Sequence, residues 1–479
     1  MVVASLFFVF IRDFTQKKHS ILRNFPVIGH FRYLLESMGV YLRQYWFSAD
    51  REEMPFNRAE RNWVYRAAKG DDTMIGFGST RDLRPVGTVM FVDAPFPVLG
   101  EDSAPTRTVT IGPNCKYPYE AKSLFNISAM SYGSISKNAV LALSNGARLG
   151  NCWLNTGEGG VSPYHLEGNC ELIAQIGTAK FGFCDVTGKL SDEALRGVAL
   201  YPQIKMFELK LSQGAKPGKG GILPAAKVTP EIAAIRFVQA HRDAISPNRH
   251  PEIANVSQLM DVIEHIRKLT GKPTGFKIVL GSYEWLEDLC KEILERGIER
   301  APDFITLDGA EGGTGAAPAS LIDYMGLPIR EGLPVLIDTL IEYGLRDRIK
   351  VIASGKLVTP ADVAWALCVG ADFINSARGF AFALGCIQAL KCHTNNCPTG
   401  VTSHRPYLMR GLDPSDKAVR VSNYVRSMLY EVGVISHSCG VKEPRELTRQ
   451  HARIMTEKGI TIALSELYPD KIPGSKVRK

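Results

Sequence analysis

Eight short, β-prone apolar runs alternate with stretches of helical periodicity beyond residue 121, and this alternation constrains the fold more than any other feature. The runs are LFNISAM (124–130), CWLNT (152–156), KFGFCD (180–185), MFELKLS (206–212), GFKIVL (275–280), DFITLDG (303–309), KVIASG (350–355) and DFINSA (372–377). Strands that alternate with helices form βαβ units, and eight of them over about 260 residues predict an α/β fold with a closed (β/α)8 TIM barrel. The alternative is an open, doubly wound sheet that binds its ligand where the strand order reverses.

Glycine-rich polar segments follow five of these runs. They are SAMSYGSIS (128–136), NTGEGG (155–160), KLSQGAKPGKGG (210–221), LDGAEGGTGAAP (307–318) and ASGK (353–356). In a parallel barrel the carboxyl ends of the strands open on one face, where the active site lies. Glycine at these ends lets the backbone approach a flat or phosphorylated ligand closely. Each segment alone is ordinary loop chemistry, but together they predict one site.

The chain is expected to contain three parts. Apolar residues recur at helical spacing between about Arg23 and Gly70, which predicts a helical N-terminal extension over residues 1–84. Gly and Pro become frequent from Gly76 to Pro118, so the barrel is expected to occupy residues 85–445. Residues 446–479 are expected to form a C-terminal helix and tail.

The first ten residues, MVVASLFFVF, are apolar, but Arg12 and Asp13 follow almost at once. A spanning helix needs about 20 apolar residues, and the run has neither the basic start nor the cleavage site of a secretory signal. Three interpretations remain: a membrane-surface anchor, the stub of a longer anchor, or a helix packed on the body. Lys17, Lys18, His19 and Arg23 would suit an anionic leaflet. We expect a cytoplasmic protein, either free or attached to a membrane surface through its N-terminus.

Composition narrows the function classes. Hydrophobic residues make up 45% and charged residues 22% of the 479 residues, as in a folded globular protein. Lys and Arg outnumber Asp and Glu by only 57 to 49, without a basic block or a basic-aromatic array, which argues against a nucleic-acid partner.

Three of the ten cysteines have a spacing that indicates chemistry. Cys386, Cys392 and Cys397 have the spacing C-x5-C-x4-C just after the eighth run, whereas the other seven are isolated and are expected to be buried thiols. Three thiolates suit a three-iron cluster, and a structural zinc would need a fourth ligand such as His393. An iron-sulfur centre is the leading interpretation, with zinc or plain buried thiols as the alternatives.

The segments ASGK and NSARG follow the seventh and eighth runs, where barrels often bind phosphate. Ser354 and Gly355 would offer donors, and Lys356 or Arg378 a cation. Capping of the next helix by Ser354 is the alternative. Beside a redox cluster, a phosphate site suggests flavin mononucleotide (FMN).

The segment KLSQGAKPGKGG places Lys210, Gln213 and Lys216 at one strand end, with Arg236 twenty residues on. Burying an unpaired ammonium group costs roughly several kcal/mol of folding free energy. The cluster of cations therefore predicts an anionic ligand that would compensate this cost. Glu158 in NTGEGG is a carboxylate that could bind an amine or move a proton. Solvated surface lysines are the alternative.

These motifs together resemble a known family. The cysteine spacing followed by Pro398 to Val401, with SAMSYGS, NTGEGG, QGAKPGKGG and DGAEGGTGAAP, is similar to the FMN-binding synthase domain of glutamate synthases over about residues 85–445. The resemblance implies a (β/α)8 barrel that holds FMN and a 3Fe-4S cluster. It also implies an oxidoreductase acting on CH-NH2 donors, which reduces the 2-iminoglutarate formed from 2-oxoglutarate and ammonia in glutamate biosynthesis.

The resemblance also implies roles for individual residues. The metal ligands would be Cys386, Cys392 and Cys397. The groups around FMN would be Ala129, Met130, Ser131, Lys277, Gly312, Gly313, Ser354, Gly355 and Arg378, although NSARG departs from the usual family wording. The 2-oxo acid would be bound by Lys210, Gln213 and Arg236, with Lys216 and Glu158 as the catalytic groups.

Departures from the family pattern affect the partners. No glutaminase domain or β-helix is recognised, and Lys219 replaces an acidic residue usual in its loop. Ammonia would come from solution or from an amidotransferase subunit, and electrons from an external donor such as ferredoxin or a reductase subunit. The alternatives are an amine-transferring synthase of the methylglutamate type and a membrane-docked flavin and iron-sulfur electron-transfer subunit.

Overall fold

The computed structural model describes residues 2–477, which divide into two compact units, Met1–Asn62 and Trp63–Lys479. The division therefore falls about twenty residues before the boundary that the sequence predicts at 84/85. The first unit contains helices α1 (Val2–Thr15), α2 (Ser20–Asn24) and α3 (Gly29–Leu42), a short π-helix and the beginning of α4 (Arg58–Lys69).

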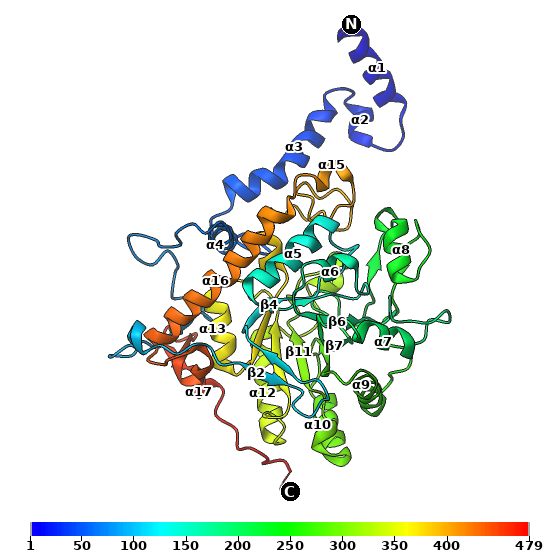
Figure 1. Ribbon diagram of the computed structural model, residues 1–479. Coiled ribbons are helices and arrows are strands. Elements are labelled where there is room, and N and C mark those ends of the chain that lie inside the picture. Colours follow the sequence, from blue (N-terminus) through cyan, green and yellow to red (C-terminus); the bar gives the residue numbers. More distant parts are fainter. Residues whose placement is uncertain (1, 478–479) are drawn as a thin grey trace. The chain divides into compact units, whose positions relative to one another are not determined.

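The second unit is built on a closed barrel of eight strands (Figure 1). The strands are β4 (Phe125–Ile127), β5 (Leu154–Asn155), β6 (Leu172–Ile176), β7 (Ile204–Lys210), β10 (Thr274–Ile278), β11 (Phe304–Asp308), β12 (Lys350–Ser354) and β13 (Phe373–Ser376). Every pairing in the barrel is parallel, and β13 returns to β4 to close it. The predicted TIM barrel is confirmed, and the open sheet is excluded.

One predicted strand was wrong. KFGFCD is a turn, because Lys180 and Gly182 have left-handed backbone angles of 53° and 76° that an extended strand excludes. The third barrel strand is instead Leu172–Ile176, in which every residue is buried. That run, LIAQI, carries a glutamine inside an apolar stretch, which weakened its sequence signal.

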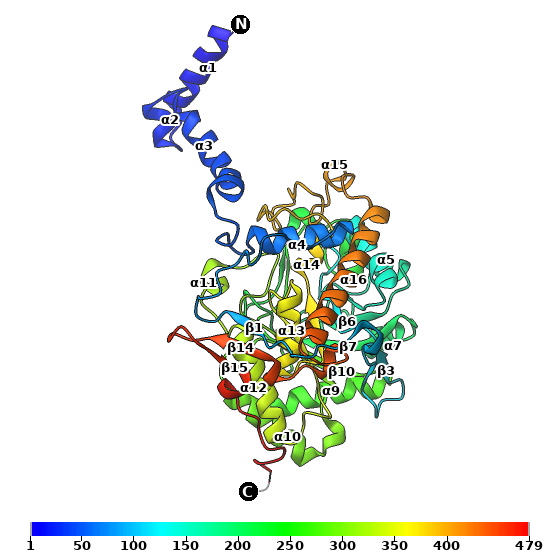
Figure 2. The ribbon, with the colours of Figure 1, turned by 90° about the vertical axis from the view of Figure 1, so that its left-hand side faces the viewer.

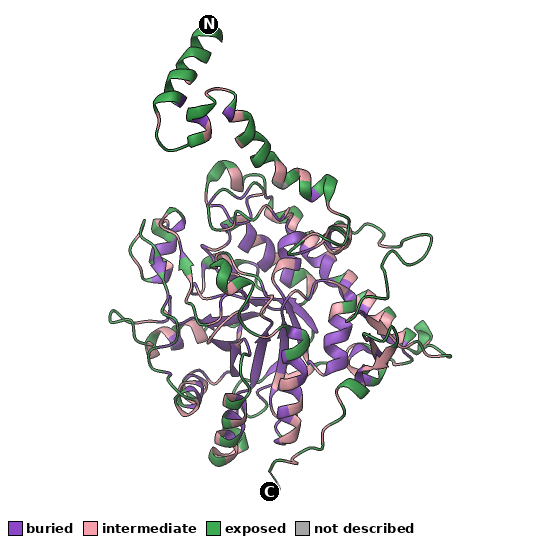
Figure 3. Ribbon diagram, turned by 180° about the vertical axis from the view of Figure 1, so that it is seen from behind, coloured by how far each residue is buried: buried purple, intermediate pink, exposed green. Residues whose placement is uncertain are grey.

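Helices cover the outside of the barrel, with local signals at their ends. Helix α5 (Lys137–Gly150) begins after Ser136, whose hydroxyl accepts a hydrogen bond from Ala139 N, and ends at Asn151 in the left-handed conformation. It packs along the long helix α16 (Pro414–Ser438). Figure 2 shows α16 beside α13 (Pro360–Val369), and Figure 3 shows the buried strands inside this layer.

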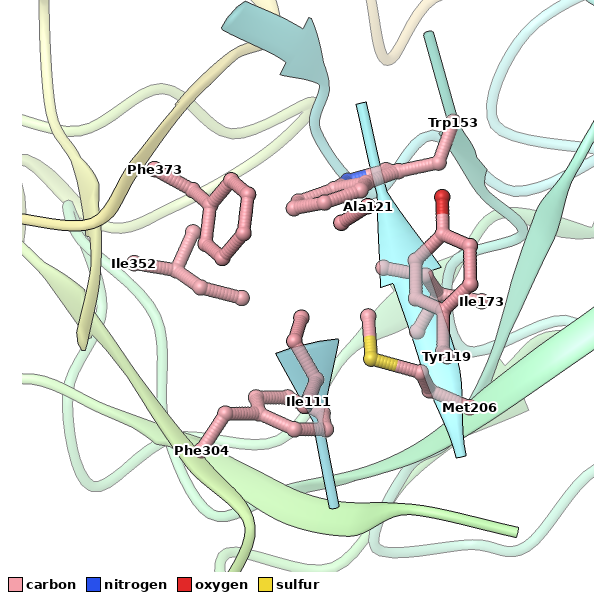
Figure 4. Close-up of a cluster of buried hydrophobic side chains, with 9 residues drawn as sticks. All are labelled: Ile111, Tyr119, Ala121, Trp153, Ile173, Met206, Phe304, Ile352 and Phe373. Carbon is pink, nitrogen blue, oxygen red and sulfur yellow. The ribbon is translucent and has the colours of Figure 1, made fainter. Parts of the chain in front are cut away.

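A hairpin closes the amino-terminal end of the barrel. Strands β2 (Val109–Ile111) and β3 (Tyr119–Ala121) pair antiparallel, and their apolar side chains join those from the strands in one buried cluster (Figure 4). The cluster comprises Ile111, Tyr119, Ala121, Trp153, Ile173, Met206, Phe304, Ile352 and Phe373. The hairpin therefore covers the amino-terminal end of the barrel core, whereas the carboxyl ends of the strands open into a cavity.

The C-terminal segment differs from the expected helix and tail. Strands β14 (Ala452–Met455) and β15 (Thr461–Ala463) form a three-stranded antiparallel sheet with β1 (Val89–Phe91) before the short helix α17 (Leu464–Leu467). This sheet joins the two ends of the barrel unit.

Candidate functional site

A cavity lies at the carboxyl ends of the barrel strands, and every site residue that the sequence predicts lines it. These residues are Ala129, Met130, Ser131, Glu158, Lys210, Gln213, Lys216, Arg236, Lys277, Gly312, Gly313, Ser354, Gly355, Arg378, Cys386, Cys392 and Cys397. They come from strand ends, loops and helices between Ala129 and Cys397, so the closure of the barrel brings them together.

An ion pair connects the second and fourth strand ends inside this cavity. Lys210, the last residue of β7, places its Nζ 2.7 Å from Oε1 of Glu158 and also donates to Oε1 of Gln213. Burial alone would raise the pKa of Glu158, but the charge and hydrogen bond of Lys210 outweigh burial and lower it. Burial lowers the pKa of Lys210, and Glu158 opposes that shift.

Two further cations of the cavity, Lys216 and Arg236, form no ion pair with any described residue. The Lys216 side chain is 5% exposed, and within the described residues its ammonium forms no hydrogen bond or ion pair. Burial, aided by the charge of Lys210, lowers the pKa of Lys216 to about 8. Arg236 donates from Nη2 to Ser131 Oγ and Tyr132 O at 3.2 and 3.0 Å, but its buried Nε has no hydrogen-bond partner among the described residues.

The charges of this group do not balance. Within the group of Lys210, Lys216, Arg236 and Glu158, the only carboxylate is that of Glu158, so the four side chains carry two net positive charges at neutral pH. The other carboxylate that acts on Lys210, that of Asp308, is paired with Lys277. Burying uncompensated charge is costly, and an anion with two carboxylates would neutralise it. The arrangement therefore suits a dicarboxylate ligand.

A second ion pair lies at the next two strand ends. Lys277 Nζ is 3.4 Å from Oδ2 of Asp308, and the same oxygen accepts a hydrogen bond from Gly214 N at 2.8 Å. Burial alone would lower the pKa of Lys277, but the charges of Asp308 and Glu208 outweigh burial and raise it. Asp308 is a site residue that sequence reasoning missed, although its place at the end of β11 was a signal.

The turn after β12 carries the donor set that a phosphate group binds. Ser354, Gly355 and Lys356 line the cavity with a hydroxyl, a left-handed backbone turn and an ammonium group. Ser354 does not cap the following helix, because α13 begins at Pro360 and is capped by Thr359. The alternative interpretation of Ser354 is therefore wrong, and the donor chemistry fits the phosphate of FMN.

Close packing between two loops of the cavity requires a glycine at position 157. Gly157 has a φ of +66°, and a Cβ there would lie 2.5 Å from Ser131 N. The absent side chain thus makes room for the neighbouring loop rather than for a ligand directly. It fixes the segment Ala129–Ser131 at the cavity wall.

The three cysteines line the same cavity, in the loop after α14 (Arg378–Ala383). Arg378 Nη1 lies 3.7 Å from Cys392 Sγ, and Nη2 donates to Thr314 O, so this side chain connects the cysteine loop to the glycine-rich loop after β11. Within residues 2–477 no group of three His, Cys, Asp or Glu side chains has the geometry to hold a metal ion. The thiols share one cavity, and their number and chemistry suit an iron-sulfur centre.

Lys227 is a second residue that sequence reasoning missed. Its buried Nζ donates to Ser134 O at 2.6 Å and to Cys392 O at 3.3 Å, which joins the first barrel loop to the cysteine loop. Tyr65 OH also donates to Cys386 O at 2.6 Å. Neither residue belongs to a motif, so the sequence offered no signal for them.

Much of this sequence is shared with known proteins. Residues 100–442 match the model of the conserved region in glutamate synthase. The glutamate synthase large subunit-like protein YerD of Bacillus subtilis (strain 168) is 41% identical over 498 residues, which cover 96% of this chain and 94% of YerD. An archaeal-type glutamate synthase (NADPH) of Thermotoga maritima is 33% identical over 343 residues, 71% of this chain and 63% of that protein.

Solved structures were compared as well. A mutant flavocytochrome b2 with benzoylformate aligns with a TM-score of 0.47 and 14% identity, covering 82% of this chain and 78% of that one. A mutant mandelate oxidase with (S)-mandelic acid gives a TM-score of 0.48 and 12% identity, covering 83% and 90%. The match to the family model extends over more than half of the chain, and with the similarity to YerD it shows that the chain belongs to the glutamate synthase family of oxidoreductases.

Proposed function

We propose that this protein reduces the imine of a 2-oxo acid, with 2-oxoglutarate as the oxo acid and L-glutamate as the product. The observation that carries the proposal is the surplus of two positive charges in the group of Lys210, Lys216, Arg236 and Glu158. The two carboxylates of 2-oxoglutarate match that surplus. Family membership supports the same substrate class.

FMN is proposed as the flavin of this cavity. Ser354, Gly355 and Lys356 would hold its phosphate, and Lys277 with the segment Ala129–Ser131 would flank its ring. When bound, FMN supplies hydride transfer to the imine carbon. Lys277 contributes a positive charge that its ion pair with Asp308 keeps in place.

A 3Fe-4S cluster is proposed for Cys386, Cys392 and Cys397. When bound, the cluster supplies single electrons from an external donor, either a ferredoxin or a reductase subunit. Arg378 and Lys227 would hold the cysteine loop at the cavity, because one contacts a thiol and the other a backbone oxygen of that loop.

The protein groups themselves bind and orient the oxo acid. Arg236 would hold the distal carboxylate through its unpartnered Nε, and Lys210 would hold the proximal carboxylate beside Glu158. Lys216 would donate a proton to the carbonyl oxygen, since a pKa of about 8 lets it hold and release a proton near neutral pH. Holding the oxo acid in one orientation with these side chains would contribute much of the enhancement of the reaction rate.

Titration of the purified flavoprotein with 2-oxoglutarate tests the proposal. We expect a saturable change in the flavin spectrum, and a much weaker response to 2-oxopentanoate, which has one carboxylate. Equal responses to both oxo acids, or none, would contradict the dicarboxylate assignment. Ammonia, glutamine and methylamine are then compared as amine donors with the reduced protein.

A further inference from the structure

The N-terminal unit exposes many apolar side chains on α1 and α3, and most residues of these two helices are coloured as exposed in Figure 3. In α1 the exposed fractions reach 81% at Val3, 63% at Phe7 and 72% at Phe8. The other large apolar residues exposed in α1 are Val2, Leu6, Phe10, Ile11 and Phe14. Exposed apolar surface on this scale marks an interaction site.

The apolar residues surround α1 rather than forming one stripe. Phe7 and Phe8 are adjacent, and consecutive helical residues point about 100° apart, so the exposed residues cover most of the circumference. Packing against a second copy of the chain would require a narrower stripe. An apolar medium covers such a helix better than another protein does.

The helix is too short to cross a bilayer. Its 14 residues extend about 21 Å, against a hydrocarbon thickness of about 30 Å. Over the described residues, no helix combines the length and apolar character needed to span a membrane.

The exposed charged side chains at the end of α1 and in the segment that follows it are basic. Arg12, Lys17, Lys18 and Arg23 are exposed. Asp13 is 1% exposed, and its Oδ2 accepts hydrogen bonds from Val27 N at 2.9 Å and His30 Nε2 at 2.8 Å. Asp13 is the only acidic residue before Glu36, so residues 2–35 present basic and apolar groups together while Asp13 is turned inward.

We propose that the N-terminal unit binds the surface of an anionic lipid bilayer. The apolar side chains of α1 enter the boundary between headgroups and acyl chains, and Arg12, Lys17, Lys18 and Arg23 meet the lipid phosphates. Charge complementarity and burial of apolar surface then act together, as two signals are needed for stable attachment.

Vesicle flotation of the full chain tests this proposal. Vesicles of phosphatidylcholine alone are compared with vesicles that also contain phosphatidylglycerol. We expect the wild type to float with the anionic vesicles, and Phe7→Glu/Phe8→Glu to bind at least about tenfold more weakly. Lys17→Glu/Lys18→Glu should lose the preference for phosphatidylglycerol. Phe96→Glu is the matched control, because Phe96 is an 89% exposed phenylalanine of the barrel unit.

Three outcomes would overturn the proposal. They are no flotation of the wild type, equal flotation with both kinds of vesicle, and unchanged flotation of Phe7→Glu/Phe8→Glu. Loss of self-association in that variant, with no effect on vesicles, would assign the surface to a second copy. The flavin response to 2-oxoglutarate is recorded for every variant and is expected to stay unchanged, so the vesicle result stands apart from the proposed function.

Discussion

Lys210 Nζ, at the end of β7, lies 2.7 Å from Oε1 of Glu158, which belongs to the loop after β5. The two residues are more than fifty positions apart in the sequence, yet each is the other's charged partner in a buried cavity. The charges of Lys216 and Arg236 also act on Glu158, so the pair is the reference point for this group of four side chains.

Glu158→Gln is expected to destabilise the protein. Removing one member of a buried ion pair costs about 3–5 kcal/mol, and we expect the lower end, about 3 kcal/mol, because the amide oxygen can still accept from Lys210. The free energy of unfolding in urea measures this. Glu167→Gln, at an exposed position in the next helix, should differ from the wild type by less than about 0.5 kcal/mol. A loss as small as that of the control would contradict the buried pair.

Binding of 2-oxoglutarate is expected to weaken as the pH rises through about 8, the pKa of Lys216. Below that pH Lys216 is charged and attracts the dianion, and above it the attraction is lost. A hydrogen bond to a charged group contributes about 1.5–3 kcal/mol, so the Kd should rise about tenfold or more. Titrations across this range measure the Kd. Lys216→Met should bind weakly with no inflection near pH 8. Lys189→Met, at an exposed position outside the cavity lining, should keep the wild-type profile.

Gly157→Ala is expected to displace the first barrel loop. The left-handed conformation costs a residue with a Cβ about 1–2 kcal/mol, and the new Cβ would lie 2.5 Å from Ser131 N, so the backbone must move as well. Flavin content per chain and the unfolding midpoint should both fall. Gly197→Ala in α7 (Asp192–Ala199) meets no atom within 4 Å and should be neutral or stabilising by up to about 1 kcal/mol. Equal flavin content in the two variants would refute this role of Gly157.

The barrel could be predicted from the sequence because seven of its eight strands are apolar runs bounded by turns. The remaining strand, Leu172–Ile176, could not be predicted in this way. KFGFCD has a strand-like composition, but Lys180 and Gly182 adopt left-handed angles that composition does not reveal. LIAQI contains Gln175, whose amide is buried because Glu208 of the neighbouring strand accepts its hydrogen bond.

The residues of the candidate site could be predicted from motifs at the strand ends. The hydrogen bonds that join the loops of the site to one another could not. Lys227 and Asp308 form hydrogen bonds with residues 93 to 165 positions away, which no local pattern encodes. The C-terminal strands depend on pairing with β1, more than 350 residues earlier. Long-range partners of this kind are determined by the folded barrel.

Cys392→Ala is expected to abolish the iron-sulfur absorption bands and most of the bound iron. The substitution removes one of the three thiolate ligands, and the remaining two cannot hold the proposed cluster. Cys184→Ala is the control, since Cys184 is a half-buried thiol of the KFGFCD turn, outside the cavity lining. Absorption spectra and iron content per chain are measured for both. Absorption bands of wild-type intensity in Cys392→Ala would contradict the proposed cluster.

The central claim is that the cavity reduces an imine of 2-oxoglutarate, and stopped-flow spectroscopy of the reduced protein tests it most directly. Mixing with 2-oxoglutarate and an amine donor under anaerobic conditions should restore the oxidised flavin absorbance, with a rate that saturates in oxo acid. Lys216→Met should slow this step by about a hundredfold or more. Reoxidation no faster than in buffer alone, with ammonia, glutamine and methylamine alike, would contradict the claim.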